Sequence, residues 1–124
     1  MLDVTPLVAA VDHLADRLRS APQSRLQRGL ADEGLSLARE LALRAQRIEF
    51  PGREPLAMPE VGMFAVADQV AVAGHDLAEA LRSAVGSAGS GGVPEASAGR
   101  PESAGAELAD AVALVEAATK RCGL

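Results

Sequence analysis

The chain has 124 residues, a net charge of −5 and 48% hydrophobic residues, which is the balance of an ordinary soluble domain. Its most apolar stretch, residues 61–74, contains Asp68 and Gln69 and is shorter than the roughly 20 residues that cross a bilayer, so no membrane partner is expected. The single cysteine, Cys122, excludes an internal disulfide, and the first residues show no signal-peptide pattern, so a cytoplasmic location is expected.

Composition also predicts the fold class. Alanine is abundant and Lys120 is the only lysine against many arginines, a bias typical of a GC-rich bacterial genome. Alanine, leucine and arginine are strong helix formers, and hairpin signals such as Asn-Gly are absent. The sequence therefore predicts an all-α domain.

The first predicted helix covers residues 5–20. Thr5 is the expected N-cap, with Pro6 at the first helical position, where its fixed φ suits a helix. Apolar residues then recur at helical spacing, and they are Leu7, Val8, Val11, Leu14, Ala15 and Leu18.

The second predicted helix covers residues 22–49. Gly34 lies in its apolar seam, so either this glycine lets another helix approach closely or it breaks the helix. The unbroken spacing on both sides of Gly34 favours close approach. The seam has heptad-like spacing and consists of Leu26, Leu30, Gly34, Leu37, Leu41, Ala45 and Ile48.

The third predicted helix covers residues 59–84, after a proline-rich turn that cannot be helical. One apolar stripe contains Val66, Val70, Ala73, Leu77 and Leu81. The first half of this helix is apolar on almost every side, more than one bundle seam requires. We therefore expect a partner surface there, made of Val61, Met63, Phe64, Val66 and Val70.

Residues 86–101 form a low-complexity Gly/Ser/Ala segment, which predicts a disordered linker. The fourth helix is expected at residues 102–121, with Leu108, Ala111, Val112, Val115 and Ala118 on its apolar face. The whole chain, residues 1–124, is predicted to be a single helical domain. Its predicted architecture is an up-and-down four-helix bundle, with three N-terminal helices and a fourth after the linker.

Candidate chemistry is sparse. His75 and Glu79 lie one helical turn apart and, together with His13, could line a pocket for a metal ion or another ligand. The Glu-x-x-His pairs of ferritin-like di-iron bundles are absent, because Ala10 and Val72 precede the two histidines by three residues. Cys122 lies beyond the last predicted helical turn, where we expect a frayed thiol with no base beside it. No metal, cofactor or catalytic residue is therefore predicted.

One short segment bears a family resemblance. Glu33-Gly34-Leu35-Ser36-Leu37 and the four residues after it resemble the Gly-x-Asp-Ser-Leu stretch of acyl and peptidyl carrier proteins, whose serine carries a phosphopantetheine arm at a helix start. The resemblance implies Ser36 as the attachment point. Leu35 replaces the family's aspartate, and Ser36 is predicted to lie inside a helix, so the carrier role is not adopted.

Two other classes are disfavoured by residues that the chain lacks or balances. The Trp-x-Gly turn and tyrosine signal of small type VII secretion substrates are missing, since there is no Trp or Tyr. Nucleic acid is not an expected partner, because the arginines of residues 22–49 are nearly cancelled by acidic residues.

The sequence favours a non-enzymatic helical module that binds a protein partner or forms a homo-oligomer. The alternative is a ligand- or metal-binding bundle, possibly enzymatic, that uses His13, His75 and Glu79.

Overall fold

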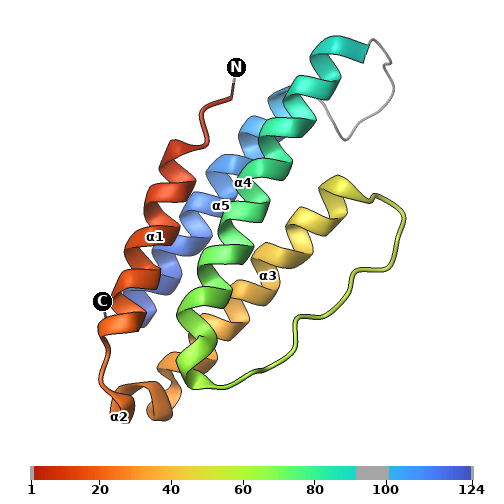
Figure 1. Ribbon diagram of the computed structural model, residues 1–124. Helices are drawn as coiled ribbons and strands as arrows, with labels where there is room; N and C mark the ends of the chain where they lie inside the picture. The colour runs from red at the N-terminus through yellow and green to blue at the C-terminus, as the bar shows by residue number, and fades with distance from the viewer. Residues whose placement is uncertain (1, 92–100, 124) are drawn as a thin grey trace.

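The computed structural model describes residues 2–91 and 101–123, and within them all regular structure is helical (Figure 1). Four long helices pack against one another, so the predicted all-α four-helix bundle is confirmed. They are α1 (Thr5–Ser20), α3 (Ala31–Glu49), α4 (Val66–Gly91) and α5 (Pro101–Arg121). Three short turns, α2 (Gln23–Arg25), η1 (Leu26–Leu30) and η2 (Met63–Ala65), lie between them. No helix of the described ranges is long and apolar enough to span a bilayer.

The helix directions differ from strict alternation. Ion pairs from Arg44 to Asp110 and from Arg121 to Glu33 show that α3 and α5 are antiparallel. The first turns of α3 and α4 lie side by side, so these two helices run parallel (Figure 1). An up-and-down order would have made them antiparallel.

The proline-rich connection explains the parallel pair. Residues 50–62, here called the crossover segment, run back along α3 from its end to its beginning (Figure 1). Extended chain covers about 3.3 Å per residue, so these residues can span roughly 43 Å, whereas the 19 residues of α3 rise only about 28 Å. The segment predicted to be a proline-rich turn is therefore long enough to return the chain to the start of α3.

The core confirms the predicted stripes of the first three helices. Leu7, Val11, Leu14 and Leu18 are buried in α1, and the seam of residues 26–45 is buried on α3 and η1, with Ile48 half-buried at its end. The stripe of Val66, Val70, Ala73, Leu77 and Leu81 is likewise buried. The described core consists of aliphatic side chains and Cys122, with no buried polar or charged residue.

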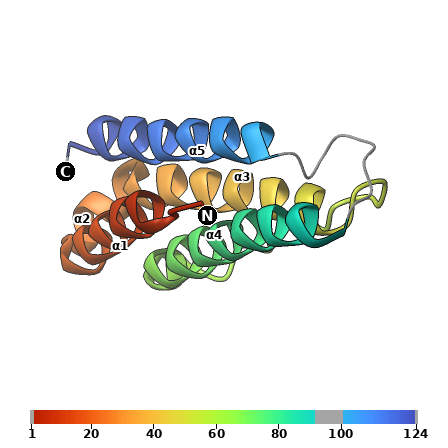
Figure 2. The same ribbon diagram turned by 90° about the horizontal axis from the view of Figure 1, so that it is seen from above.

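The last helix packs mainly through small side chains. It lies along one side of the other three long helices and contacts each of them (Figure 2). Leu108 and Val112, expected to be central, are only half-buried at the edges of its apolar face. The residues at its centre are Ala104, Ala111, Val115, Ala118 and Cys122. Little apolar area per residue therefore holds α5, although its axis can come close to its neighbours.

The start of α1 differs from the predicted cap. Thr5 is the first helical residue, and the backbone N–H of Thr5 donates to the Asp3 carboxylate at 3.0 Å. The N-cap position is therefore Val4 and not Thr5, and no side chain of the N-cap residue makes a capping bond.

The continuous helix predicted over residues 22–49 is wrong, and the break lies at Gly29. This residue has φ +115°, a conformation open to glycine because it has no Cβ, and the chain turns there from α2 into α3. Gly34 remains helical. A Cβ atom on Gly34 would overlap Val66 Cγ1 of α4 and lie 3.3 Å from Leu18 Cδ1 of α1. The prediction that Gly34 permits close helix approach is confirmed.

The limits of α4 also shift. Helical structure begins at Met63 and not at Pro59. Gly62 has φ +111°, which is not a helical conformation, so the helix cannot include Gly62 or the residues before it. At the other end α4 continues to Gly91, so residues 86–91 of the predicted linker are helical. Extending a helix that has already formed adds a hydrogen bond per residue, which offsets a weak composition. The remaining predicted linker residues, 92–100, lie outside the described residues, and Pro101 already belongs to α5.

The first prediction concerns the core. Leu37→Ala and Leu77→Ala should each lower the free energy of unfolding by about 2–5 kcal/mol, because both side chains are buried and their loss leaves a cavity. Leu56→Ala removes the same atoms from a side chain that is 81% exposed, and it should change the free energy of unfolding by less than about 0.5 kcal/mol. Urea titration measures all three. Equal losses at the three sites would contradict the assignment of the core.

The second prediction compares two helical glycines. Gly34→Ala should destabilise the fold, although alanine favours a helix by about 1 kcal/mol, because the added Cβ meets Val66. Gly105→Ala is the matched control in α5, since no atom lies within 4 Å of its added Cβ, and it should stabilise by up to about 1 kcal/mol. If both substitutions stabilise alike in urea titration, the α3–α4 contact does not constrain Gly34.

Candidate interaction surface

The structure divides the predicted partner surface into two parts. Val61 and Phe64 are 61% and 72% exposed, and Met63 is half-buried between them. Val66 and Val70 are buried in the core, so assigning them to a partner surface was wrong. The reason is that α4 contacts α1, α3 and α5, and a helix with neighbours on several sides needs apolar residues on several sides.

Exposed large hydrophobic residues cluster in one part of the sequence. Among the described residues they all fall between residues 50 and 72, on the crossover segment, η2 and the first half of α4, and they are Phe50, Leu56, Val61, Phe64 and Val72. Both aromatic residues of the chain belong to this group. The bundle core therefore uses aliphatic side chains, while the two aromatic rings face solvent.

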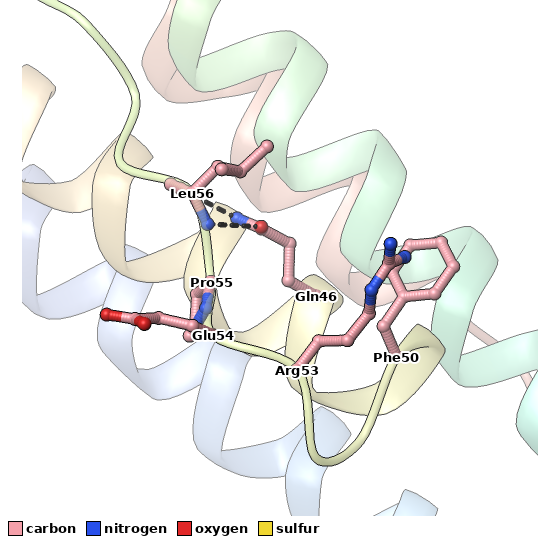
Figure 3. Close-up of a pocket in the computed structure, with 6 residues that line it drawn as sticks. All are labelled: Gln46, Phe50, Arg53, Glu54, Pro55 and Leu56. Carbon is pink, nitrogen blue, oxygen red and sulfur yellow. Dashed lines mark hydrogen bonds between the residues drawn. The ribbon is translucent and has the colours of Figure 1, made fainter.

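Side chains of α3 hold one end of the crossover segment in place. The amide group of Gln46 pairs with the backbone of Leu56 in both directions: its Oε1 accepts from Leu56 N at 2.7 Å and its Nε2 donates to Leu56 O at 3.0 Å (Figure 3). Nearby, the Arg53 guanidinium lies over the Phe50 ring, 5.1 Å from its centre, and these residues line a cavity of about 190 Å³ (Figure 3).

Two further hydrogen bonds guide the segment toward the start of α4. Arg39 Nε donates to Met58 O at 2.9 Å, and Gln69 Nε2 donates to Pro59 O at 2.9 Å. The segment has no regular secondary structure, so side-chain groups from α3 and α4 satisfy these backbone carbonyls. The crossover segment thus runs antiparallel to α3, and Val61 and Phe64 lie near the first turns of α3.

A cleft opens beside the exposed Val61 and Phe64. It lies between the η1–α3 region and η2, has a volume of about 220 Å³, and carries the carboxylates of Asp32 and Glu60 on its lining. The apolar part of the lining consists of Leu26, Ala31, Leu35, Met63 and Val66. We call Val61, Met63, Phe64 and this cleft the Phe64 surface.

The residues of the metal hypothesis are engaged in other contacts. His75 Nε2 lies 2.8 Å from Asp12 Oδ1, and Glu79 forms an ion pair with Arg82 on the same helix. His13 is exposed on α1. Within residues 2–91 and 101–123, no group of three or more His, Cys, Asp or Glu side chains is arranged to hold a metal ion.

Neither candidate nucleophile has catalytic surroundings. Ser36 is exposed inside α3 and not at a helix start, while Leu35 beside it is buried. Cys122 is not frayed: it is buried, its N–H donates to Ala118 O at 3.0 Å, and its carbonyl accepts from Arg25 at 2.7 Å. Burial raises the pKa of the Cys122 thiol, which disfavours the reactive thiolate.

A third cavity, of about 360 Å³, lies where α3, α4 and α5 meet near the end of α3. Its floor includes Ile48, Leu81 and Ala104, and Arg44 on its edge is paired with Glu40 and Asp110. The hydrogen bond to Glu40, followed by that to Asp110, raises the pKa of Arg44. The Arg44–Asp110 ion pair thus links α3 to α5 at the edge of this cavity.

Comparisons with protein-family models, with curated protein sequences and with solved structures find no match to this chain.

Sequence reasoning missed the exposed apolar residues of the crossover segment. Phe50 and Leu56 are exposed there, and the Gln46 side chain fixes the backbone of Leu56. The signal available was the proline-rich composition, which excluded helix but did not indicate that the segment follows α3. That placement depends on hydrogen bonds between residues ten or more positions apart.

The third prediction concerns Gln46. Gln46→Ala should increase the hydrogen-exchange rate of the Leu56 amide, measured by NMR, because that amide loses its only described acceptor. Gln46→Glu is the matched control, since a carboxylate oxygen can still accept from Leu56 N and should preserve most of the protection. Slow exchange of Leu56 in the alanine variant would show that Gln46 does not hold the segment.

Proposed function

We propose that this protein is a non-enzymatic helical interaction module that binds a protein partner, or a second copy of itself, through the Phe64 surface. The single observation that carries the proposal is the position of Phe64. Its ring is 72% exposed in a chain that contains only two aromatic residues.

An exposed aromatic ring contributes little to the stability of its own fold, yet aromatic side chains are the residues that most often anchor interfaces. Here Phe64 directly follows Met63, which lines the cleft, and exposed Val61 lies in sequence between the lining residues Glu60 and Gly62. Patches of exposed apolar residues with polar groups around them mark interaction sites.

The surroundings of the other candidate groups also favour binding over catalysis. Cys122 is buried, and burial raises the pKa of its thiol. Within the described residues, no hydrogen bond joins the Ser36 hydroxyl to a side chain that could act as a base. The ligand- or metal-binding alternative is less well supported, because His75 and Glu79 are each engaged by another side chain.

Nucleic acid is a poor candidate partner, since three of the arginines in residues 22–49 are engaged within the fold: Arg44 pairs with carboxylates, and Arg25 and Arg39 each donate to a backbone carbonyl. A basic, one-signed face is what nucleic-acid binding requires. We further propose that the module works in the cytoplasm, where a single unpaired cysteine is the common state.

The fourth prediction tests the surface directly. A photo-crosslinking amino acid placed at Val61 should yield a covalent adduct with a protein in cells that naturally express this chain. The same amino acid at Glu116, an exposed position on α5, should not. Adding Phe64→Ser to the Val61 variant should remove the adduct while changing the free energy of unfolding by less than about 0.5 kcal/mol.

Mass spectrometry of the adduct identifies either a different protein or a second copy. Absence of an adduct at position 61, or the same adduct from positions 61 and 116, would contradict the proposal. So would a large loss of stability in Phe64→Ser, since that would make the ring a structural residue.

A further inference from the structure

The chemistry of the Phe64 surface indicates what kind of partner it fits, and this inference rests on the proposed function. The cleft has an apolar lining of Leu26, Leu35 and Met63, with two carboxylates, Asp32 and Glu60, on opposite elements. Asp32 comes from the first turn of α3 and Glu60 from the crossover segment.

Neither carboxylate has an ion-pair partner within the described ranges, whereas other acids near this end of the bundle do. Asp68 pairs with Arg19 at 3.0 Å, and Glu33 pairs with Arg121 at 3.0 Å. The nearest arginine along α3, Arg39, donates to the Met58 carbonyl. Asp32 and Glu60 are thus two carboxylates at the cleft that form no ion pair within the described ranges.

We propose that the Phe64 surface binds a cationic amphipathic segment of a different protein. One large apolar side chain of that segment enters the cleft and packs beside Phe64, and flanking lysine or arginine residues pair with Asp32 and Glu60. A second copy of this chain is disfavoured as the occupant, because the chain carries a net charge of −5 and two such acidic clefts repel each other.

The size of the cleft agrees with this arrangement. A volume of about 220 Å³ accommodates one side chain and not a small-molecule cofactor, whose pockets begin at roughly 300 Å³. Exposed Val61 and Phe64, which are adjacent in sequence to the lining residues Glu60, Gly62 and Met63, offer further apolar contact to a docked helix.

The probe for the test is a fluorescent synthetic helical peptide with leucine and one phenylalanine on its apolar face and lysine on its polar face. A matched peptide carries glutamate in place of every lysine. Fluorescence anisotropy should show that the lysine peptide binds the full chain at least about tenfold more tightly than the glutamate peptide. In NMR titration, the largest amide shifts should fall on Leu35 and Met63.

Charge variants locate the effect. Asp32→Asn combined with Glu60→Gln should weaken binding of the lysine peptide about fivefold, as expected for the loss of two surface ion pairs. Asp76→Asn with Glu116→Gln removes the same charge from exposed positions elsewhere and should leave the affinity within about twofold. Asp32→Lys with Glu60→Lys should reverse the preference in favour of the glutamate peptide. Urea titration of each variant checks that the fold persists, because Asp32 also lies near the start of a helix.

Several results would overturn the inference and leave the proposed function intact. They are equal binding of the two peptides, equal weakening by the two neutral double variants, and a Val61 adduct that proves to be a second copy of the chain. Failure of both peptides to bind would also overturn it, while a heterologous Val61 adduct would still support the interaction module.

Discussion

The arrangement of the bundle depends on two glycine contacts, which allow α4 to pack closely against α3 and α1. Gly34 of α3 has no side chain, so Val66 at the start of α4 lies against the α3 backbone. Farther along, a Cβ on Gly74 of α4 would stand 2.5 Å from Val11 Cγ2 of α1. Helices approach this closely only where one partner lacks a side chain. At these contacts α4 packs closely on α3 and α1, and it also contacts α5.

Close helix spacing also accounts for where the aromatic residues are found. The interior is filled by leucine, valine and alanine, whose volumes suit the short distances between axes. Phe50 and Phe64 lie instead on the crossover segment and η2, both outside the packed layers. Since α3 and α4 start together, the crossover segment must return the whole length of α3, and its last residues reach solvent beside the first turns of both helices. The Phe64 surface is a product of that geometry.

The attachment of α5 has a different physical basis. Its central residues are mostly alanine, so its burial contributes less per residue than that of α1 or α4. Side-chain contacts supplement this burial: Arg44 pairs with Asp110 at the middle of α5, and near its C-terminal end Arg121 pairs with Glu33 and Arg25 donates to the Cys122 carbonyl. Exposed ion pairs are individually weak, but they help to fix the orientation of α5, because its small apolar side chains specify that orientation only weakly.

The sequence by itself determined the local features of this protein. Helical periodicity identified four helical regions and the buried stripes of the first three, because the spacing of Leu14 and Leu18, or of Leu77 and Leu81, is a property of one helix. The close approach at Gly34 was also foreseen, since a glycine in an apolar seam has few other uses.

The tertiary structure decided what depends on contacts between distant segments. The helix break at Gly29 was not predicted, and it is the folded chain that places this glycine in a left-handed conformation while Gly34 stays helical against Val66 and Leu18. In the same way, Val66, Val70, Val61 and Phe64 belong to one apolar run. Packing of α4 in the bundle buries Val66 and Val70. Val61 and Phe64 stay exposed, because they lie on the crossover segment and η2, on either side of Gly62 with its positive φ. Which apolar residues face a partner is a property of the assembled bundle, because burial is defined by neighbours that the local sequence does not specify.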